Sequence, residues 1–127
     1  MIVSMDYIFS FEKLIVWQKA RHLVKRIYSL PLPDQEIYGL NMQMKRASVS
    51  ISSNIAEGAS RNTFKEKSRF INLAYGSLME LYSQILVCLD LGYIDQNNHD
   101  ELKSLIVEIH NMLNGLLKSF NSSQTNI

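Results

Sequence analysis

The sequence predicts an all-α protein built as an antiparallel up-down-up-down four-helix bundle. Only two prolines and five glycines interrupt 127 residues, which favours long helices over many short strands. Apolar residues recur at spacings of three and four along four separate segments. Short connections between these segments place consecutive helices side by side in opposite directions. The alternative is an extended helical pair that completes its core only in a dimer.

The length and composition indicate one globular domain. A chain of 127 residues has a single-domain length. Its 46% hydrophobic and 20% charged residues are typical of a folded protein and exclude general disorder. We expect the bundle to occupy residues 11–121, with a flexible segment at 1–10 and a flexible tail at 122–127.

The first helix is expected from Phe11 to Leu30. Its apolar residues share one face, and Pro31 disfavours helix in the residue before it. A second long helix is expected from Leu40 to Ala59. Gly58 is predicted to end that helix in the left-handed conformation that glycine tolerates.

The third helix is predicted to begin at a capping box, Thr63 to Glu66, and to end at Gly92. Asp95 can cap the fourth helix, which is expected to continue to Phe120 and carries the cleanest amphipathic pattern in the chain.

The third helix has apolar residues on two sides. A helix of this kind usually packs against two partners, and in so small a bundle the second partner is expected to be another subunit. Gly76 indicates either a close backbone approach there or a tolerated glycine. The second apolar face supplies the candidate oligomer interface: Ile71, Leu78, Tyr82 and Ile85.

Charge is divided unevenly along the chain. Residues 1–69 carry eleven Lys/Arg against six Asp/Glu, and residues 70–127 carry two against six. A basic half can attract an anionic partner, or it can meet the acidic half of a neighbouring copy.

The basic residues are expected to form two groups at opposite ends of the bundle, which suit phosphate contacts or simply form a solvated face. The sequence reveals no aromatic platform for stacking bases. The candidate nucleic-acid-binding residues are Lys25, Arg26, Lys45, Arg61, Lys65, Lys67 and Arg69.

A polar stripe on the second helix contains Arg46, Asn54 and Glu57. A buried charge needs a partner, and Arg61 or Arg69 can pair with Glu57 across the turn to the third helix. A structural role in fixing register and a ligand-contacting role both remain open for this cluster.

The residues do not predict catalysis, a cofactor or a metal site. The three histidines lack zinc-ligand spacing, and no phosphate loop or nucleophile elbow occurs. Cys88 is the single cysteine and cannot form an internal disulfide, which favours a cytoplasmic protein. Residues 1–10 do not resemble a signal peptide, and no apolar run is long enough to span a membrane.

Several ordered motifs resemble one known family. They occupy Phe11 to Ala20, Gln43 to Ser50, Asn54 to Gly58, Phe70 to Leu81, and Asp90 to Ile94. The chain is similar over residues 9–120 to the four-helix bundle proteins encoded in intervening sequences of bacterial 23S ribosomal RNA. The resemblance implies a ring-like homopentamer, a bacterial source and no known catalytic activity. A related branch, the accessory variability protein of diversity-generating retroelements, binds a reverse transcriptase and nucleic acid.

Three functional hypotheses follow. The first is a non-catalytic oligomer that binds structured RNA or an RNA–protein complex through its basic clusters. The second is an assembly subunit whose partners are proteins, without direct nucleic-acid contact. The third is an enzyme or metal protein, which the residues favour least.

Overall fold

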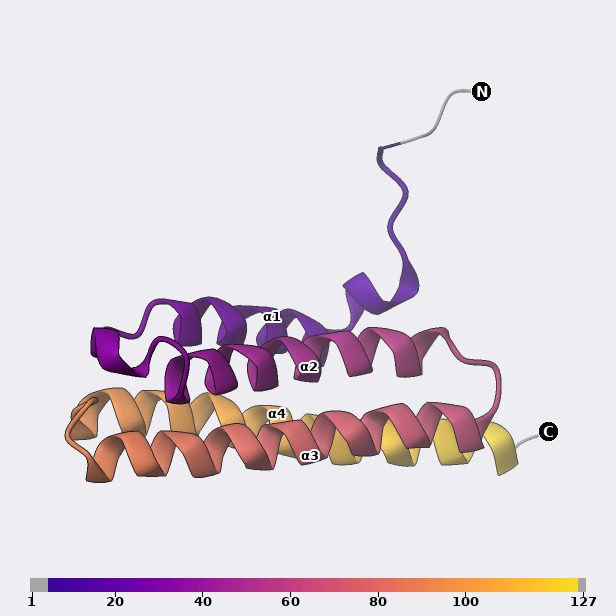
Figure 1. Cartoon of the computed structure of the whole chain (residues 1–127). Coiled ribbons are helices and arrows are strands. Elements are labelled where there is room, and N and C mark those ends of the chain that lie inside the picture. The colour runs from indigo at the N-terminus through magenta and orange to yellow at the C-terminus, as the bar shows by residue number, and fades with distance from the viewer. Residues whose placement is uncertain (1–4, 126–127) are drawn as a thin grey trace.

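The computed structural model describes residues 5–125 as four helices with two short 3-10 turns and no strand (Figure 1). The helices are α1 (Ile15–Tyr28), α2 (Leu40–Ser60), α3 (Phe64–Asp90) and α4 (Gln96–Thr125). The 3-10 turns are η1 (Ser10–Lys13) and η2 (Asp34–Glu36). Residues 1–4 and 126–127, the outer parts of the two segments expected to be flexible, lie outside the described residues.

The first helix begins four residues later than expected. Leu14 has an extended backbone, with φ −72° and ψ 123°, and this interrupts the path from η1 into α1. The residues before Leu14 form the separate turn η1. Glu12 stabilises the start of this turn, because its Oε2 accepts a hydrogen bond of 2.8 Å from the backbone N–H of Phe9. The end of α1 at Tyr28 agrees with the proline-rich connection that follows.

Gly58 does not end α2 as predicted. The helix continues to Ser60, and among the described residues Gly92 alone has a positive φ. Gly58 is buried instead where α2 crosses α3. A Cβ at this position would lie 3.0 Å from Ile71 Cδ1 and 3.1 Å from the Lys67 carbonyl oxygen. The glycine is therefore needed for close approach between the two helices.

This close contact makes a specific stability prediction. Gly58→Val should lower the free energy of unfolding by about 1–3 kcal/mol, because the added atoms overpack the crossing of α2 and α3. Gly76 provides a matched control, since a Cβ there meets nothing within 4 Å. Gly76→Val should change stability by no more than about 0.5 kcal/mol. Equal urea midpoints for the two variants would contradict the packing role of Gly58.

The ends of α3 and α4 follow ordinary capping chemistry. The Thr63 hydroxyl accepts a hydrogen bond of 3.2 Å from the Glu66 N–H at the start of α3. Gly92, with φ 76°, ends the α3 segment as predicted, and the Tyr93 N–H donates to the Cys88 carbonyl over 2.9 Å. Helix α4 runs five residues beyond the expected Phe120, to Thr125.

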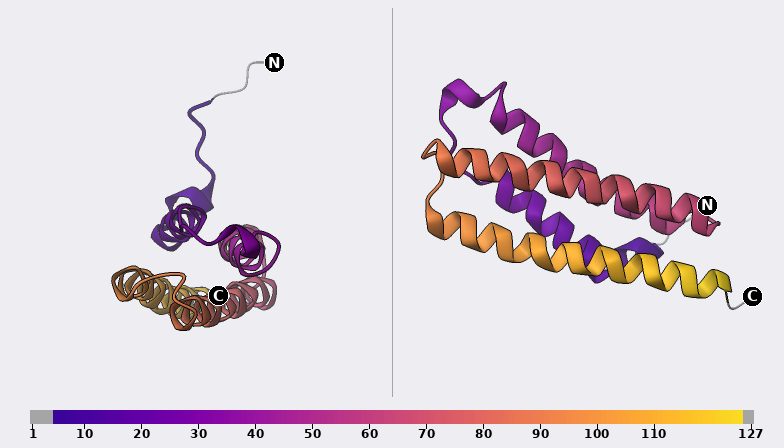
Figure 2. Two further views of the ribbon diagram at one scale, coloured as in Figure 1. Left: turned by 60° about the vertical axis from the view of Figure 1, so that its left-hand side comes forward. Right: turned by 90° about the horizontal axis from the view of Figure 1, so that it is seen from below.

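The four helices are arranged around a common core (Figure 2), and apolar side chains from all four form it. Near the start of α2, the Met44 sulfur lies 3.5 Å from the Cys88 thiol near the end of α3. Further along, Ser50 and Ser77 join the middles of the same helices through their hydroxyls at 2.9 Å. Two ion pairs connect α1 to α4: Lys19 with Glu108 at 2.6 Å, and Arg26 with Glu101 at 2.9 Å.

Three of the four residues predicted to form an oligomer interface lie inside the subunit. Ile71, Leu78 and Ile85 are each 0% exposed and belong to the core. Tyr82 is half-buried, and its hydroxyl lies 3.1 Å from His99 Nε2 of α4. The prediction is wrong for Ile71, Leu78 and Ile85, because α2 and α4 of the same chain cover two sides of α3.

Candidate nucleic-acid interface

Four of the predicted basic residues lie together where α2 connects to α3. Arg61 is the residue that follows α2, and its extended backbone turns the chain towards Thr63. Lys65, Lys67 and Arg69 follow within the first two turns of α3. We call these four residues the basic end; in Figure 1 they lie at the right-hand connection.

Both arginines of the basic end have carboxylate partners. Arg61 pairs with Glu57 at 2.7 Å, and Arg69 pairs with Glu66 at 3.4 Å. The two guanidinium groups also lie 4.8 Å and 5.0 Å from the centre of the Phe70 ring. Exposed ion pairs of this kind contribute only about 0–1 kcal/mol, so a phosphate can replace the carboxylate at small cost.

The two lysines of the basic end differ in their surroundings. Lys67 donates to the Ala59 carbonyl over 3.2 Å, and its ammonium lies 4.8 Å from the Phe120 ring. The Lys65 side chain is exposed, and within the described residues its ammonium has no hydrogen-bond or ion-pair partner. The start of α3 adds partial positive charge beside it. Lys65 is therefore the cation of the basic end that is most available to an anion.

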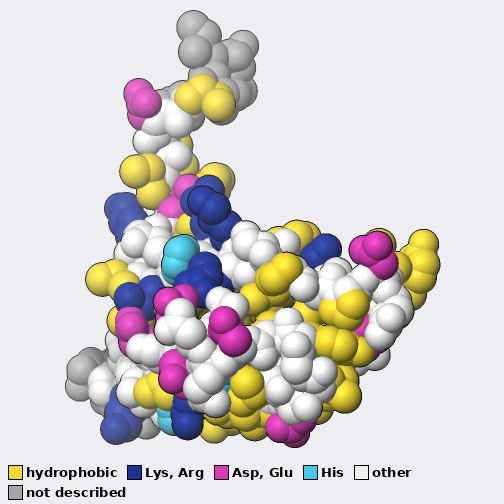
Figure 3. All heavy atoms as spheres, turned by 90° about the vertical axis from the view of Figure 1, so that its left-hand side faces the viewer, with side chains coloured by type: hydrophobic (Ala, Val, Ile, Leu, Met, Phe, Trp, Pro, Cys, Tyr) yellow, Lys and Arg dark blue, Asp and Glu magenta, His cyan; other side chains and the backbone are white. Residues whose placement is uncertain are grey.

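The other three candidates lie towards the opposite end of the bundle. Arg26 is paired with Glu101 of α4, and the Lys45 ammonium lies 4.9 Å from the Tyr28 ring. Lys25 is exposed on α1. Figure 3 looks onto this end and shows Lys and Arg side chains mixed with acidic ones. The seven predicted residues thus form two groups: two of the four cations at the basic end have carboxylate partners, and so has one of the three at the opposite end.

The predicted polar cluster on α2 is dispersed along the helix. Asn54 donates to the Ser50 carbonyl over 2.9 Å and to the Ser50 hydroxyl over 3.0 Å. Glu57 pairs with Arg61, one of the two partners expected for it. Arg46 is exposed and lies 3.9 Å from the Met42 sulfur, with no carboxylate partner among the described residues. Ser50 therefore links Asn54 to α3, whereas Arg46 remains open at the surface.

Sequence reasoning missed a buried polar contact at His99, which is only 7% exposed. Its Nε2 faces the Tyr82 hydroxyl, and its Nδ1 lies 2.9 Å from Asp100 Oδ1. A proton on Nδ1 lets the ring donate to Asp100 and accept from Tyr82. The signal was present in the spacing, since His99 precedes Leu102 and Ile106 on the buried face of α4.

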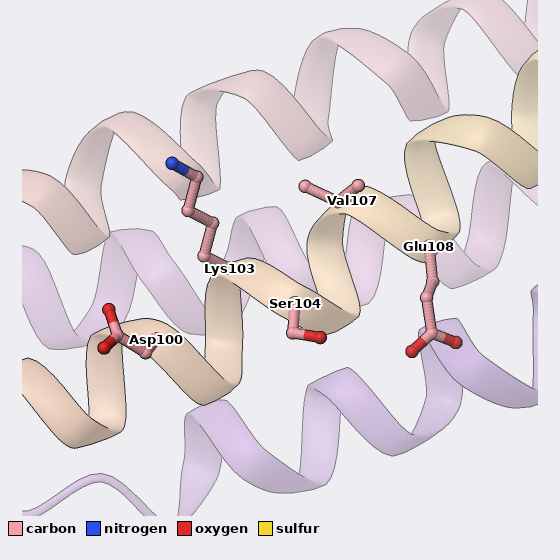
Figure 4. A pocket seen from close by; sticks show the side chains of 5 residues that line it. All are labelled: Asp100, Lys103, Ser104, Val107 and Glu108. Atoms are coloured by element: carbon pink, nitrogen blue, oxygen red, sulfur yellow. The ribbon is translucent and has the colours of Figure 1, made fainter.

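A shallow depression of about 450 Å³ lies on α4 (Figure 4). Hydrogen bonds from His99 and then from Gln96 lower the pKa of Asp100, which therefore carries a carboxylate at neutral pH. Glu108 is held by Lys19 of α1. These groups provide charge but no activated nucleophile, so the depression does not form a catalytic constellation. Its lining residues are Asp100, Lys103, Ser104, Val107 and Glu108.

Cys88 has a packing role. Its side chain is fully buried, and its thiol donates to the Met44 sulfur. Burial raises the pKa of the Cys88 thiol, and the negative charge of Glu36 raises it further. The neutral thiol is therefore favoured, which makes Cys88 a poor nucleophile or metal ligand.

Among the described residues, no group of three or more His, Cys, Asp or Glu side chains is placed to hold a metal ion. Within residues 5–125, no helix combines the length and apolar character needed to cross a membrane.

The fold and the basic end define a small four-helix bundle with a charged binding surface as its main candidate site. Residues 12–115 match the family model described as 23S rRNA-intervening sequence protein, so the chain belongs to that family, as its motifs suggested. A crystal structure of a protein of unknown function from the S23 ribosomal protein family of Bacteroides thetaiotaomicron is similar in fold. It has a TM-score of 0.75 at 20% sequence identity, covering 82% of this chain and 96% of that chain. No curated protein matches the chain.

Proposed function

We propose that this protein is a non-catalytic oligomeric binding protein that associates with structured RNA, or with an RNA–protein complex, through its basic end. The observation that carries the proposal is the grouping of four cations at one connection, with Lys65 unpaired among the described residues. The family description associates these proteins with intervening sequences of 23S ribosomal RNA. It names no reaction, and the similar crystal structure is of a protein of unknown function.

The chemistry of the basic end suits a phosphate backbone. Arginine binds phosphate through a planar fork of donors, and an exposed lysine supplies a point charge. Each cation that contacts a phosphate releases a counterion, so binding of this kind weakens as salt rises. Fluorescence anisotropy with a labelled ribosomal RNA fragment at two salt concentrations tests the proposal. Binding at low salt that weakens at high salt is expected, and no binding at low salt would refute it.

The proposed assembly is a ring-like homopentamer of antiparallel up-down-up-down bundles, located in the cytoplasm with the RNA. The directions of the helices are supported by the paired contacts of α2 with α3 and of α1 with α4. The uneven charge along the chain supports contact between copies, since the basic first half can meet the acidic second half of a neighbour.

A row of exposed apolar side chains on α3 favours the second candidate function, an assembly subunit without nucleic-acid contact. A monomer seldom leaves so much apolar surface on one helix without a partner for it. Leu73, Val87 and Leu91 are 48%, 42% and 54% exposed. We call the exposed apolar residues of α3 and of its C-cap the outer row: Leu73, Met79, Leu86, Val87 and Leu91.

A charge placed on the outer row is expected to weaken assembly. Val87→Arg should shift the light-scattering mass from oligomer to monomer, because the arginine would be desolvated at the contact between copies. The circular dichroism spectrum should be unchanged, since Val87 lies outside the core. Asn114→Arg, at an exposed polar position of α4, is the control and should keep the wild-type mass. An unchanged mass for Val87→Arg would contradict assembly through the outer row.

A further inference from the structure

We infer that the N-terminal aromatic segment binds unpaired nucleotide bases by stacking, next to the phosphate-binding basic end. This inference rests on the proposed RNA-binding function and specifies the part of the RNA that is recognised. It concerns the rings of Tyr7, Phe9, Phe11 and Trp17, which we call the aromatic ladder.

The ladder arises from the local backbone. In an extended chain, side chains two residues apart lie on the same side, which places Tyr7 and Phe9 together, and Phe11 follows within η1. The Tyr7 and Phe9 ring centres are 5.0 Å apart, and the Phe9 and Phe11 rings are stacked at 6.4 Å with an interplanar angle of 15°. Phe11 then meets Trp17 edge to face at 5.0 Å. Four rings thus form a continuous series.

The ladder is fixed at its base and open at its tip. Trp17 is half-buried against the core of the bundle, and η1 packs on both α1 and α2. Tyr7 and Phe9 are 68% and 59% exposed, on a segment that leaves the bundle (Figure 1). Figure 3 shows hydrophobic side chains along this segment with solvent around them. Exposed neighbouring rings are a costly surface for a monomer and indicate a binding role.

Charge next to the rings favours nucleic acid as the ligand. The Arg21 guanidinium lies 5.5 Å from the Trp17 ring, and Lys13 is exposed between Phe11 and Trp17. Asp6 and Glu12 are the acidic residues of this segment, and the Glu12 carboxylate accepts a hydrogen bond from the Phe9 N–H. At the basic end, Arg61 and Arg69 flank the Phe70 ring. Rings beside cations bind single strands, since bases stack on the rings and phosphates contact the cations.

The experiment compares a labelled unstructured RNA with the same RNA annealed to its complement, and with a DNA strand of equal sequence. The double variant Tyr7→Ala/Phe9→Ala should bind the single strands about 10- to 100-fold more weakly, because each stacked ring contributes about tenfold. Its affinity for the duplex should equal that of the wild type. The control is Ile8→Ala, an exposed apolar residue of the same segment without a ring, which should bind like the wild type.

The other outcomes distinguish a failure of the ladder from a failure of the proposed function. Unchanged single-strand binding by Tyr7→Ala/Phe9→Ala, with wild-type binding present, would refute the ladder but keep the proposed function. A change in light-scattering mass without a change in RNA affinity would refute it in favour of a self-association segment. Failure of the wild type to bind any of the nucleic acids at low salt would refute the proposed function as well. A loss for the RNA strand but not the DNA strand would support the ladder as an RNA-selective site.

Discussion

Leu78→Ala is expected to lower the free energy of unfolding by about 2–5 kcal/mol, the range for deleting a fully buried leucine side chain. Leu78 is 0% exposed and lies in the core of a single subunit. The variant loses the burial of its apolar atoms and leaves a cavity that tightly packed neighbours only partly fill. For a domain of this size, such a loss removes a large fraction of the total stability.

Urea denaturation followed by circular dichroism measures this effect, and Leu73→Ala is the matched control. Leu73 is on the same helix but 48% exposed, so its truncation should cost less than about 1 kcal/mol in a dissociated subunit. The comparison therefore distinguishes the buried face of α3, which carries Leu78, from its exposed face, which carries Leu73. Equal losses for both variants would show that Leu78 is no more important to the core of one chain than a surface leucine.

The double variant Lys65→Ala/Arg69→Ala is expected to bind structured RNA on the order of 10- to 100-fold more weakly at low salt. The slope of log affinity against log salt should fall by about 2, one for each cation removed. Both side chains are exposed and alanine favours helix, so α3 should remain folded. Removal of Arg69 also leaves Glu66 without its ion-pair partner, which adds repulsion towards phosphate.

Anisotropy titrations over a series of salt concentrations measure both quantities. Lys103→Ala is the control, because Lys103 is an exposed lysine of α4 beside the acidic Asp100. It should bind RNA with the wild-type slope. If Lys65→Ala/Arg69→Ala retained the wild-type affinity and slope, the basic end would not be the RNA-binding surface.

The helices were predictable because their signals are local. The capping residue Thr63 and the positive φ of Gly92 mark boundaries that the structure contains. Gly58 was misread because helix-ending glycines and close-packed glycines look alike in sequence. Only the close contacts of Gly58 with Ile71 and Lys67 in the folded chain show that it is a close-packed glycine. The start of α1 was misplaced because Glu12 closes a separate turn, which apolar spacing does not record.

The candidate site was predictable in composition but not in contacts. The charge count identified the cations, since it requires no knowledge of the fold. It did not show that Arg26 is paired with Glu101, because these residues are far apart in the chain. The second apolar face of α3 was recognised, but its partner was taken for another subunit. The aromatic ladder was missed because Tyr7 and Phe9 belong to the segment that was expected to be flexible, although alternate side chains of an extended segment share a face.

Lysine footprinting with and without RNA tests the central claim most directly, because one experiment reports on lysines at both ends of the bundle. An amine-reactive label is applied at low salt to the free protein and to the complex with a structured ribosomal RNA fragment, and labelled peptides are quantified by mass spectrometry. The account predicts that RNA protects Lys65 and Lys67 at the basic end, whereas Lys103 on α4 stays reactive. Equal labelling of Lys65 and Lys67 in the free protein and in the complex would contradict it.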